Sequence, residues 1–161
     1  ADGGEILAMD IQEMALEKTA RRLEQEGYSP EKGAFWQTFC HRKRQQKIHL
    51  LLDGHEHMEA YAQPESVDLI LFNLGYLPGG DHQLATKAET TICALEQALS
   101  LLKKEGMISL VIYSGGDSGF AEKNAVLSWL KELDSRKYLV VTESFYNRPN
   151  HPPLPVWIKK L

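Results

Sequence analysis

The chain has 161 residues, of which 43% are apolar and 25% are charged. This length corresponds to about one domain, and the composition excludes disordered, collagen-like and coiled-coil proteins. The formal net charge is −4, so any contact with a nucleic acid must use a local basic patch. No apolar run approaches the ~20 residues of a membrane span, the polar N-terminus lacks the apolar core of a signal peptide, and Cys40 and Cys93 form no C-x-x-C motif. We therefore expect a soluble cytoplasmic protein with no membrane partner.

Short β-rich runs alternate with longer helical stretches along the chain. The predicted strands are Glu5–Met9, Lys47–Leu52, Val67–Phe72, Met107–Tyr113, Tyr138–Ser144 and Val156–Lys160. The predicted helices are Ile11–Glu26, Lys87–Lys104 and Ala121–Leu133, with a weak helical turn at His57–Ala62. Gly27 and Gly106 are expected to end the first two helices. The strands at Val67–Phe72 and Met107–Tyr113 are nearly continuous apolar runs, typical of strands buried on both faces.

This alternation predicts an α/β, Rossmann-like fold with a mostly parallel sheet. The last two strands are joined without a helix, through the proline-rich stretch Asn147–Pro155, and should form an antiparallel pair. Two glycine-rich loops are expected, at Asn73–Asp81 and Ser114–Gly119. We expect one domain over residues 1–161, with Tyr28–Gln46 as its one plausible insertion.

Polar residues or glycines follow the predicted strands, where ligands bind in open α/β sheets. Asp10 ends the first strand, where doubly wound folds place an acid that accepts hydrogen bonds from the ribose hydroxyls of a cofactor. The neighbouring Ile11 and Gln12 would share that site. The alternative is a capping box, because Glu13 stands three residues after Asp10.

The turn Asp53-Gly54-His55 follows the second predicted strand and offers acceptors and a backbone N–H to an adenine edge. An Asp-Gly turn with no ligand is the competing interpretation. His55, His57 and His82 have no carboxylate or thiolate in register, so we expect no metal site.

Asn73 and Tyr76 follow the buried strand Val67–Phe72 and form the most suggestive pair. A side-chain amide oxygen at a strand end can orient an amine toward a sulfonium methyl group, and an aromatic ring can stack on a base. A simple turn is the alternative, but Leu74, Leu77 and Pro78 are more apolar than an idle surface loop. We therefore favour a pocket wall.

The run His41-Arg-Lys-Arg44, together with Lys47, puts five fixed or potential positive charges within seven residues. Such a run is usually a solvated face. Because Phe35 and Trp36 precede it, a contact that combines phosphate attraction with base stacking is a credible alternative, with Arg42 and Arg44 binding RNA.

Several strings match one known family. They are Met9-Asp-Ile-Gln12, Phe72-Asn-Leu-Gly-Tyr-Leu-Pro-Gly-Gly-Asp81, Thr86-Lys87, Glu89-Thr-Thr91, Asn147 and Asn150-His-Pro-Pro153. Over nearly its whole length the chain resembles the bacterial family labelled "putative rRNA methylase", whose members are class I S-adenosylmethionine-dependent methyltransferases. The resemblance implies methylation of the amino group of 5-aminomethyl-2-thiouridine at the tRNA wobble position, in the anticodon region.

The resemblance also implies roles for individual residues. Asp10 would bind the cofactor ribose, the turn Asp53–His55 its adenine, and the run from Asn73 through Leu74 and Gly75 to Tyr76 would border the methyl group. The residues on the side of the modified base would be Tyr76, Pro78, Gly79, Gly80, Asp81, Thr86, Tyr113 and Asn147. Asn73, Tyr76 and Asp81 would be catalytic, with Asp81 or His82 nearest to take the proton of the amine.

The chain departs from the family pattern at three places. Members normally open with a strand and a glycine-rich loop, whereas this chain starts after that point. We therefore expect an N-terminal segment to be missing from the printed chain, and the sheet to have a gap between the strands that end at Asp10 and Asn73. Members tend to carry histidines where this chain has Ser114 and Gly116, and the basic stretch before Lys47 looks inserted.

Other functions stay open from the sequence. The alternatives are a non-catalytic, methyltransferase-like RNA-binding module, an rRNA methyltransferase and, more weakly, a nicotinamide-dependent oxidoreductase, which needs a G-x-G-x-x-G motif. The expected partner is tRNA, and a homodimer is the assembly to test.

Overall fold

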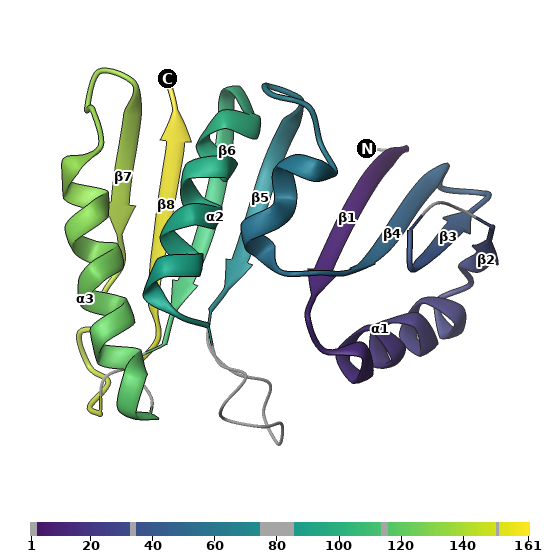
Figure 1. Ribbon diagram of the computed structural model, residues 1–161, viewed down its shortest axis with the longest axis horizontal. Helices are drawn as coiled ribbons and strands as arrows, with labels where there is room; N and C mark the ends of the chain where they lie inside the picture. Colours follow the sequence, from purple (N-terminus) through teal and green to yellow (C-terminus); the bar gives the residue numbers. More distant parts are fainter. Residues whose placement is uncertain (1–2, 33–34, 75–85, 114–115, 151) are drawn as a thin grey trace. The chain divides into compact units, whose positions relative to one another are not determined.

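The computed structural model describes residues 3–32, 35–74, 86–113, 116–150 and 152–161 (Figure 1). The chain divides into two units, Ala1–His57 and Met58–Leu161. Each unit holds one four-stranded sheet. The expectation of one domain over the whole chain stays a prediction.

The first unit holds one helix and one mixed sheet. Its elements are β1 (Gly4–Asp10), α1 (Glu13–Gln25), β2 (Ser29–Glu31), β3 (Gln37–His41) and β4 (Gln46–Leu52). The strand order is β1-β4-β3-β2; β1 runs parallel to β4, and the other pairings are antiparallel. A buried cluster joins the helix to the sheet through Leu16, Ala20, Phe39, Ile48 and Leu50. The predicted insertion Tyr28–Gln46 thus supplies β2 and β3 and extends the sheet beyond β4.

Helix α1 ends as the sequence predicts. Leu16 and Ala20, four residues apart, are buried against the sheet, so the apolar stripe faces the core. Gly27 has φ +86°, in the left-handed region that favours glycine. Its N–H donates to the Glu24 carbonyl, and the Tyr28 N–H donates to the Leu23 carbonyl. These two bonds satisfy carbonyls that the end of the helix would otherwise leave unpaired.

The second unit packs two helices on one face of its sheet (Figure 1). Its elements are β5 (Val67–Asn73), α2 (Ala88–Leu101), β6 (Leu102–Ile112), α3 (Gly116–Glu132), β7 (Tyr138–Thr142) and β8 (Leu154–Lys160), and the short 3-10 helix η1 (His55–Ala60) connects the two units. The strand order is β5-β6-β8-β7, with β5 parallel to β6. β8 is antiparallel to both β6 and β7, which confirms the predicted antiparallel C-terminal pair.

Within the second unit, the described helices cover only one face of the sheet (Figure 1). Ile108, Leu110 and Ile112 of β6 alternate along the strand and are fully buried. On β5, Leu69 is 53% and Leu71 is 70% exposed. The prediction that the strand Val67–Phe72 is buried on both faces is therefore wrong for the second unit as described, because its two described helices lie on the other face of the sheet (Figure 1).

Two element boundaries differ from the sequence predictions. Helix α2 ends at Leu101, and β6 begins at Leu102 instead of Met107. Leu102 is fully buried and pairs with Val67, so strand pairing extends into residues whose spacing also fits a helix. Gly106 therefore lies inside a strand and does not end the helix.

Helix α3 begins at Gly116, five residues before the predicted start at Ala121. The part of the predicted loop Ser114–Gly119 that the structure describes is thus helical.

The α/β, Rossmann-like class is confirmed, but the described sheets are mixed, not mostly parallel. Each sheet has one parallel pair, β1 with β4 and β5 with β6. The β2–β3 pair and the C-terminal pair add antiparallel strands. β1 and β5 belong to different sheets. The expected gap between the strands that end at Asp10 and Asn73 stays a prediction. None of the described helices is long and apolar enough to cross a membrane.

Candidate functional site

Two predicted cofactor residues lie side by side at the carboxyl edge of the first sheet. Because β1 and β4 are parallel and Asp10 is in register with Leu52, the next residue of β4's chain, Asp53, leaves the sheet beside Asp10. Carboxyl ends of parallel strands are where α/β folds bind ligands. The structure therefore groups the two acids as the sequence predicts.

Asp10 uses one of its carboxylate oxygens within its own loop. The Gln12 N–H donates to Asp10 Oδ1 over 2.8 Å, and Gln12 is the N-cap of α1. Glu13 is the first residue of the helix, so the pair does not form the capping box that was the alternative. Oδ2 makes no hydrogen bond to a described residue, and Asp10 is half-buried. This oxygen can accept a hydrogen bond from a ligand.

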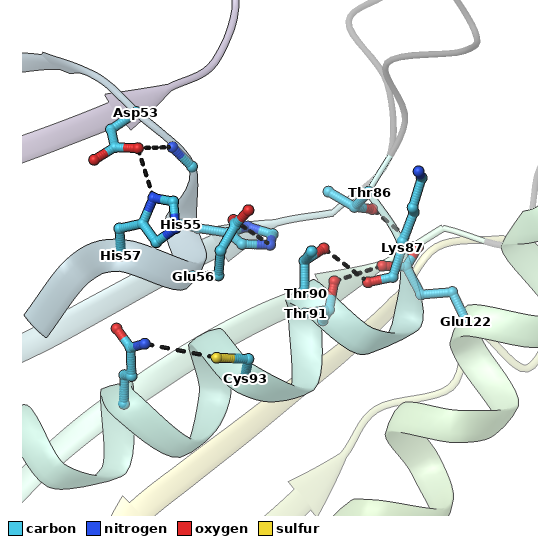
Figure 2. Close-up of polar contacts among 12 residues, drawn as sticks. Asp53, His55, Glu56, His57, Thr86, Lys87, Thr90, Thr91, Cys93 and Glu122 are labelled. Carbon is cyan, nitrogen blue, oxygen red and sulfur yellow. Dashed lines mark hydrogen bonds and ion pairs between the residues drawn. The ribbon is translucent and has the colours of Figure 1, made fainter.

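The turn after β4 is organised by Asp53 (Figure 2). Asp53 Oδ1 accepts from the Gly54 N–H over 2.8 Å and lies 2.7 Å from Nδ1 of His57. The hydrogen bond that Asp53 Oδ1 accepts from the His57 ring, and then the negative charge of Asp53, raise the pKa of His57 above the ordinary 6.5. Gly54 is buried, and a Cβ there would meet the carboxylate of Glu56, the end of a flexible side chain that would have to move aside.

A second group of predicted residues meets at the carboxyl edge of the second sheet. Asn73 ends β5 in register with Val111 of β6, and Tyr113 follows the end of β6. The Asn73 side chain is exposed and makes no hydrogen bond to a described residue. Leu74 is buried, and its N–H donates to the Val111 carbonyl, so only its backbone could contact a ligand.

Thr86 belongs to a buried polar cluster that the sequence reasoning missed (Figure 2). Glu122 of α3 is only 4% exposed, and its two oxygens accept from the hydroxyls of Thr86, over 2.9 Å, and Thr91, over 2.7 Å. The carboxylate thereby ties the residues at the start of α2 to α3. The available signal was spacing, because Glu122 lies four and eight residues before the buried Val126 and Leu130.

Asn147 lies in the connection between β7 and β8, which leaves and enters the sheet at this same edge. The start of β8, Leu154, is in register with Ile112 at the end of β6. Across the base of the connection, the Glu143 N–H donates to the Pro155 carbonyl. Asn147 itself is exposed.

The basic residues Arg42 and Arg44 do not join these groups. They lie in the turn between β3 and β4, at the end of the first sheet opposite to Asp10 and Asp53. The Gly3 N–H donates to the Arg44 carbonyl, and the Arg44 N–H donates to Nδ1 of His41, so the backbone of Gly3 and the side chain of His41 hold the turn. β4 has seven residues, or about 20 Å of strand, between this turn and the carboxyl edge.

Several predicted residues lie outside the described part of the chain. They are Gly75, Tyr76, Pro78, Gly79, Gly80, Asp81, His82 and Ser114. Within the described residues, no group of three or more His, Cys, Asp or Glu side chains could hold a metal ion.

Comparison with known proteins shows the family to which the chain belongs. A family model described as "Putative rRNA methylase" matches residues 6–159. A curated relative, a chloroplastic tRNA (mnm(5)s(2)U34)-methyltransferase from Arabidopsis thaliana, is 34% identical over 161 residues, which cover 98% of this chain and 53% of the relative. The chain thus spans about half the length of that relative.

Three solved structures are also similar to this chain. A putative rRNA methylase from Clostridium thermocellum is 39% identical with a TM-score of 0.83, and the match covers 98% of this chain and 76% of that one. A putative methyltransferase from Streptococcus mutans, solved in complex with SAH, is 33% identical with a TM-score of 0.78 and the same coverage. An rRNA methylase from Streptococcus thermophilus is 27% identical, with a TM-score of 0.72, over 99% of this chain and 88% of that one.

Proposed function

The chain belongs to the rRNA methylase family, and from this premise we propose that it is an S-adenosylmethionine-dependent RNA methyltransferase. Its proposed substrate is 5-aminomethyl-2-thiouridine at the wobble position of tRNA, methylated on the amino group. The observation that carries the proposal is the pair of polar side chains with unengaged atoms at strand carboxyl ends: the Asp10 carboxylate and the Asn73 amide. The name of the Arabidopsis relative supports the choice of tRNA.

The residues after β1 and β4 fit the proposed cofactor. Asp10 is half-buried and its Oδ2 has no described partner, so this oxygen can accept from a ribose hydroxyl while Oδ1 keeps its bond to Gln12. The Asp53–His55 turn, with its buried Gly54, would take the adenine edge. When bound, S-adenosylmethionine supplies a methyl group on a positively charged sulfonium.

Asn73 would orient the acceptor amine. Its amide oxygen can accept an N–H of the amine, which aims the nitrogen lone pair away from Asn73. Holding the amine in one orientation beside the bound methyl donor makes the reaction effectively unimolecular. An aliphatic amine is mostly protonated at neutral pH, so a group of the chain must receive its proton. Asp81 and His82, in the segment after Asn73, are the proposed acceptors.

The proposed partner is the anticodon region of tRNA, with Thr86, Tyr113 and Asn147 on the side of the modified base. The Thr86 hydroxyl already donates to Glu122, so it would meet the RNA as an acceptor. Arg42 and Arg44, at the opposite end of the first sheet, would bind phosphates away from the reacting base. Location in the cytoplasm and assembly as a homodimer stay predictions.

The test uses the natural full-length protein and tRNA that lacks only the final methyl group. With labelled cofactor, nucleoside mass analysis should find the label in 5-methylaminomethyl-2-thiouridine. Unmodified rRNA serves as the second substrate. Label in rRNA alone would replace the substrate assignment by an rRNA methyltransferase, and label in neither RNA, with RNA binding intact, would favour a non-catalytic RNA-binding module.

A further inference from the structure

The exposed Phe and Tyr side chains of the described residues gather at one edge of the molecule's second unit. Tyr113 and Phe120 are 41% and 45% exposed, Phe145 is 49% exposed, and Tyr146 is fully exposed. Every other described Phe or Tyr is buried or half-buried. We call these four residues the aromatic edge. Large apolar side chains collected at one exposed place usually mark a binding surface.

The aromatic edge is built from two connections and one helix. Tyr113 follows β6 directly, and Phe120 lies in the second turn of α3, which begins three residues later. Phe145 and Tyr146 lie between β7 and β8, and this connection returns to the sheet where Leu154 pairs with Ile112. Figure 1 shows the β7–β8 connection and the start of α3 at the same end of the sheet.

The same edge carries Asn73, the proposed amine-orienting residue, since Asn73 pairs with Val111 two residues before Tyr113. The β7–β8 connection also has one cation, the exposed Arg148, whose N–H donates to the Phe145 carbonyl and closes a turn behind Tyr146. An aromatic surface with a cation beside it suits a partner with flat, polarisable rings and negative charge.

We propose that the aromatic edge is a stacking platform for the unpaired bases of an RNA loop, with Tyr146 as its most exposed ring. The inference rests on the proposed function and deepens it, because it names the part of the RNA that this edge recognises. Duplex RNA keeps its bases stacked inside the helix and offers no free face to these rings, whereas a loop does. Stacking on a ring accepts any base, so the platform adds affinity and not sequence choice.

The test measures binding of the full-length protein to a labelled anticodon stem-loop and to a fully paired duplex of equal length, by fluorescence anisotropy. Tyr146→Ala should weaken stem-loop binding by at least about fivefold, and Tyr146→Phe, which keeps the ring, by less than about twofold. Duplex binding should change in neither variant. Phe145→Ala provides a second, independent loss of a ring.

Salt dependence separates stacking from charge. Tyr146→Ala should lower affinity without changing the slope of log affinity against log salt, whereas Arg148→Gln should flatten that slope. In Tyr146→Trp, stem-loop binding should quench the fluorescence of the new indole. Affinity for S-adenosylhomocysteine, measured by calorimetry, should be unchanged in all variants and serves as the check of folding.

Two results would overturn the platform: equal stem-loop affinity in wild type, Tyr146→Ala and Phe145→Ala, or a wild type that binds duplex as tightly as the stem-loop. The proposed function fails separately. If the stem-loop is bound through these rings but tRNA lacking the final methyl receives no label, the substrate assignment is lost and the platform stands.

Discussion

At the residue scale, Asp10 has both a structural and a proposed ligand role, and its two oxygens separate them. Oδ1 holds the Gln12 N–H, while Oδ2 has no described partner. A carboxylate that accepts from ribose hydroxyls makes charge-assisted bonds of about 1.5–3 kcal/mol each. Asp10→Ala should therefore weaken binding of S-adenosylhomocysteine by about tenfold or more, as measured by calorimetry.

Asp10→Asn separates the two roles. The amide oxygen of the variant can still accept from the Gln12 N–H, but the negative charge and the second carboxylate oxygen are gone. We expect Asp10→Asn to keep the fold and to lose most of the affinity. Glu13→Ala, which removes the neighbouring carboxylate on the first residue of α1, is the matched control and should bind normally. Unchanged affinity in Asp10→Ala would leave this residue with only its bond to Gln12.

Asn73 is the second residue whose role can be isolated. Its amide is exposed and unengaged among the described residues, so Asn73→Ala should disturb the fold little. If the amide orients the amine, the single-turnover methylation rate should fall by about a hundredfold while cofactor affinity changes little, because the lost contact matters chiefly in the transition state. A mutant as fast as wild type would move that role to Tyr76, Asp81 or the backbone of the same loop.

At the scale of elements, pattern alone predicted those whose signals are local. Helix α1 has an apolar stripe and a glycine at its end, and both appear in the structure. The end of α2 could not be predicted, because Leu102 continues the helical spacing and only its pairing with Val67 makes it a strand. Glu105 adopts φ +66° next to Gly106, a backbone conformation that its residue type does not announce.

The buried face of α3 shows the same limit. Ala125, Trp129 and Leu133 stand four residues apart and form an apolar row, but they are only half-buried. The most buried of the described side chains of this helix are Glu122, Val126 and Leu130. From the sequence alone, a charged residue such as Glu122 is assigned to the solvent-exposed border of an apolar helix face. Only the structure explains why Glu122 is buried, because it shows the Thr86 and Thr91 hydroxyls donating hydrogen bonds to the Glu122 carboxylate.

This cluster makes a stability prediction. Thr91 is fully buried, and Thr91→Val removes the donor to one oxygen of a buried carboxylate. The unfolding free energy should fall by about 1–3 kcal/mol, as measured by urea unfolding. Thr90→Val is the matched control, because the Thr90 hydroxyl donates to the Lys87 carbonyl on the exposed side and should cost less than about 0.5 kcal/mol. Equal losses in both variants would contradict the cluster's role.

The turn after β4 makes a pH prediction. Because Asp53 raises the pKa of His57, the pair stabilises the fold fully below the ordinary value of 6.5. That contribution is lost as the pH rises through the raised pKa. An NMR titration should find the His57 pKa above 6.5 in the wild type and lower in Asp53→Asn. The melting temperatures of the two proteins should differ more at about pH 5.5 than at about pH 8.5. An unshifted His57 in the wild type would argue against the pair.

At the scale of the whole molecule, the sequence predicted the α/β class and the grouping of Asp10 with Asp53, since both follow from the order of strands. The sequence did not predict that β2 and β3 would join the first sheet. Ser29–Glu31 has no alternation of apolar and polar residues, and it becomes a strand only by pairing with Thr38–Cys40 of β3. The same pairing carries the basic turn to the end of the sheet opposite Asp10. The turn can therefore contribute phosphate contacts only away from the carboxyl edge of the first sheet.

Because the whole chain has a net charge of −4, RNA phosphates must be bound by a local basic patch, and this turn is the proposed patch. Its contribution to RNA binding can be tested by removing its charges. Arg42, Lys43 and Arg44 are exposed, and each phosphate contact releases counterions. Neutralising the three to glutamine should weaken tRNA binding and reduce the slope of log affinity against log salt by about 2. Because the turn lies away from the carboxyl edge, the single-turnover rate at saturating tRNA should stay near that of the wild type.

A matched control removes the same charge from another element of the first unit. It neutralises three exposed cations of α1: Lys18, Arg21 and Arg22. If tRNA binding senses only net charge, both triple variants will flatten the slope equally. If the turn contacts phosphates, only its own variant will do so. An unchanged slope in the Arg42–Arg44 variant would return this turn to a solvated surface and leave the RNA to be held at the carboxyl edge alone.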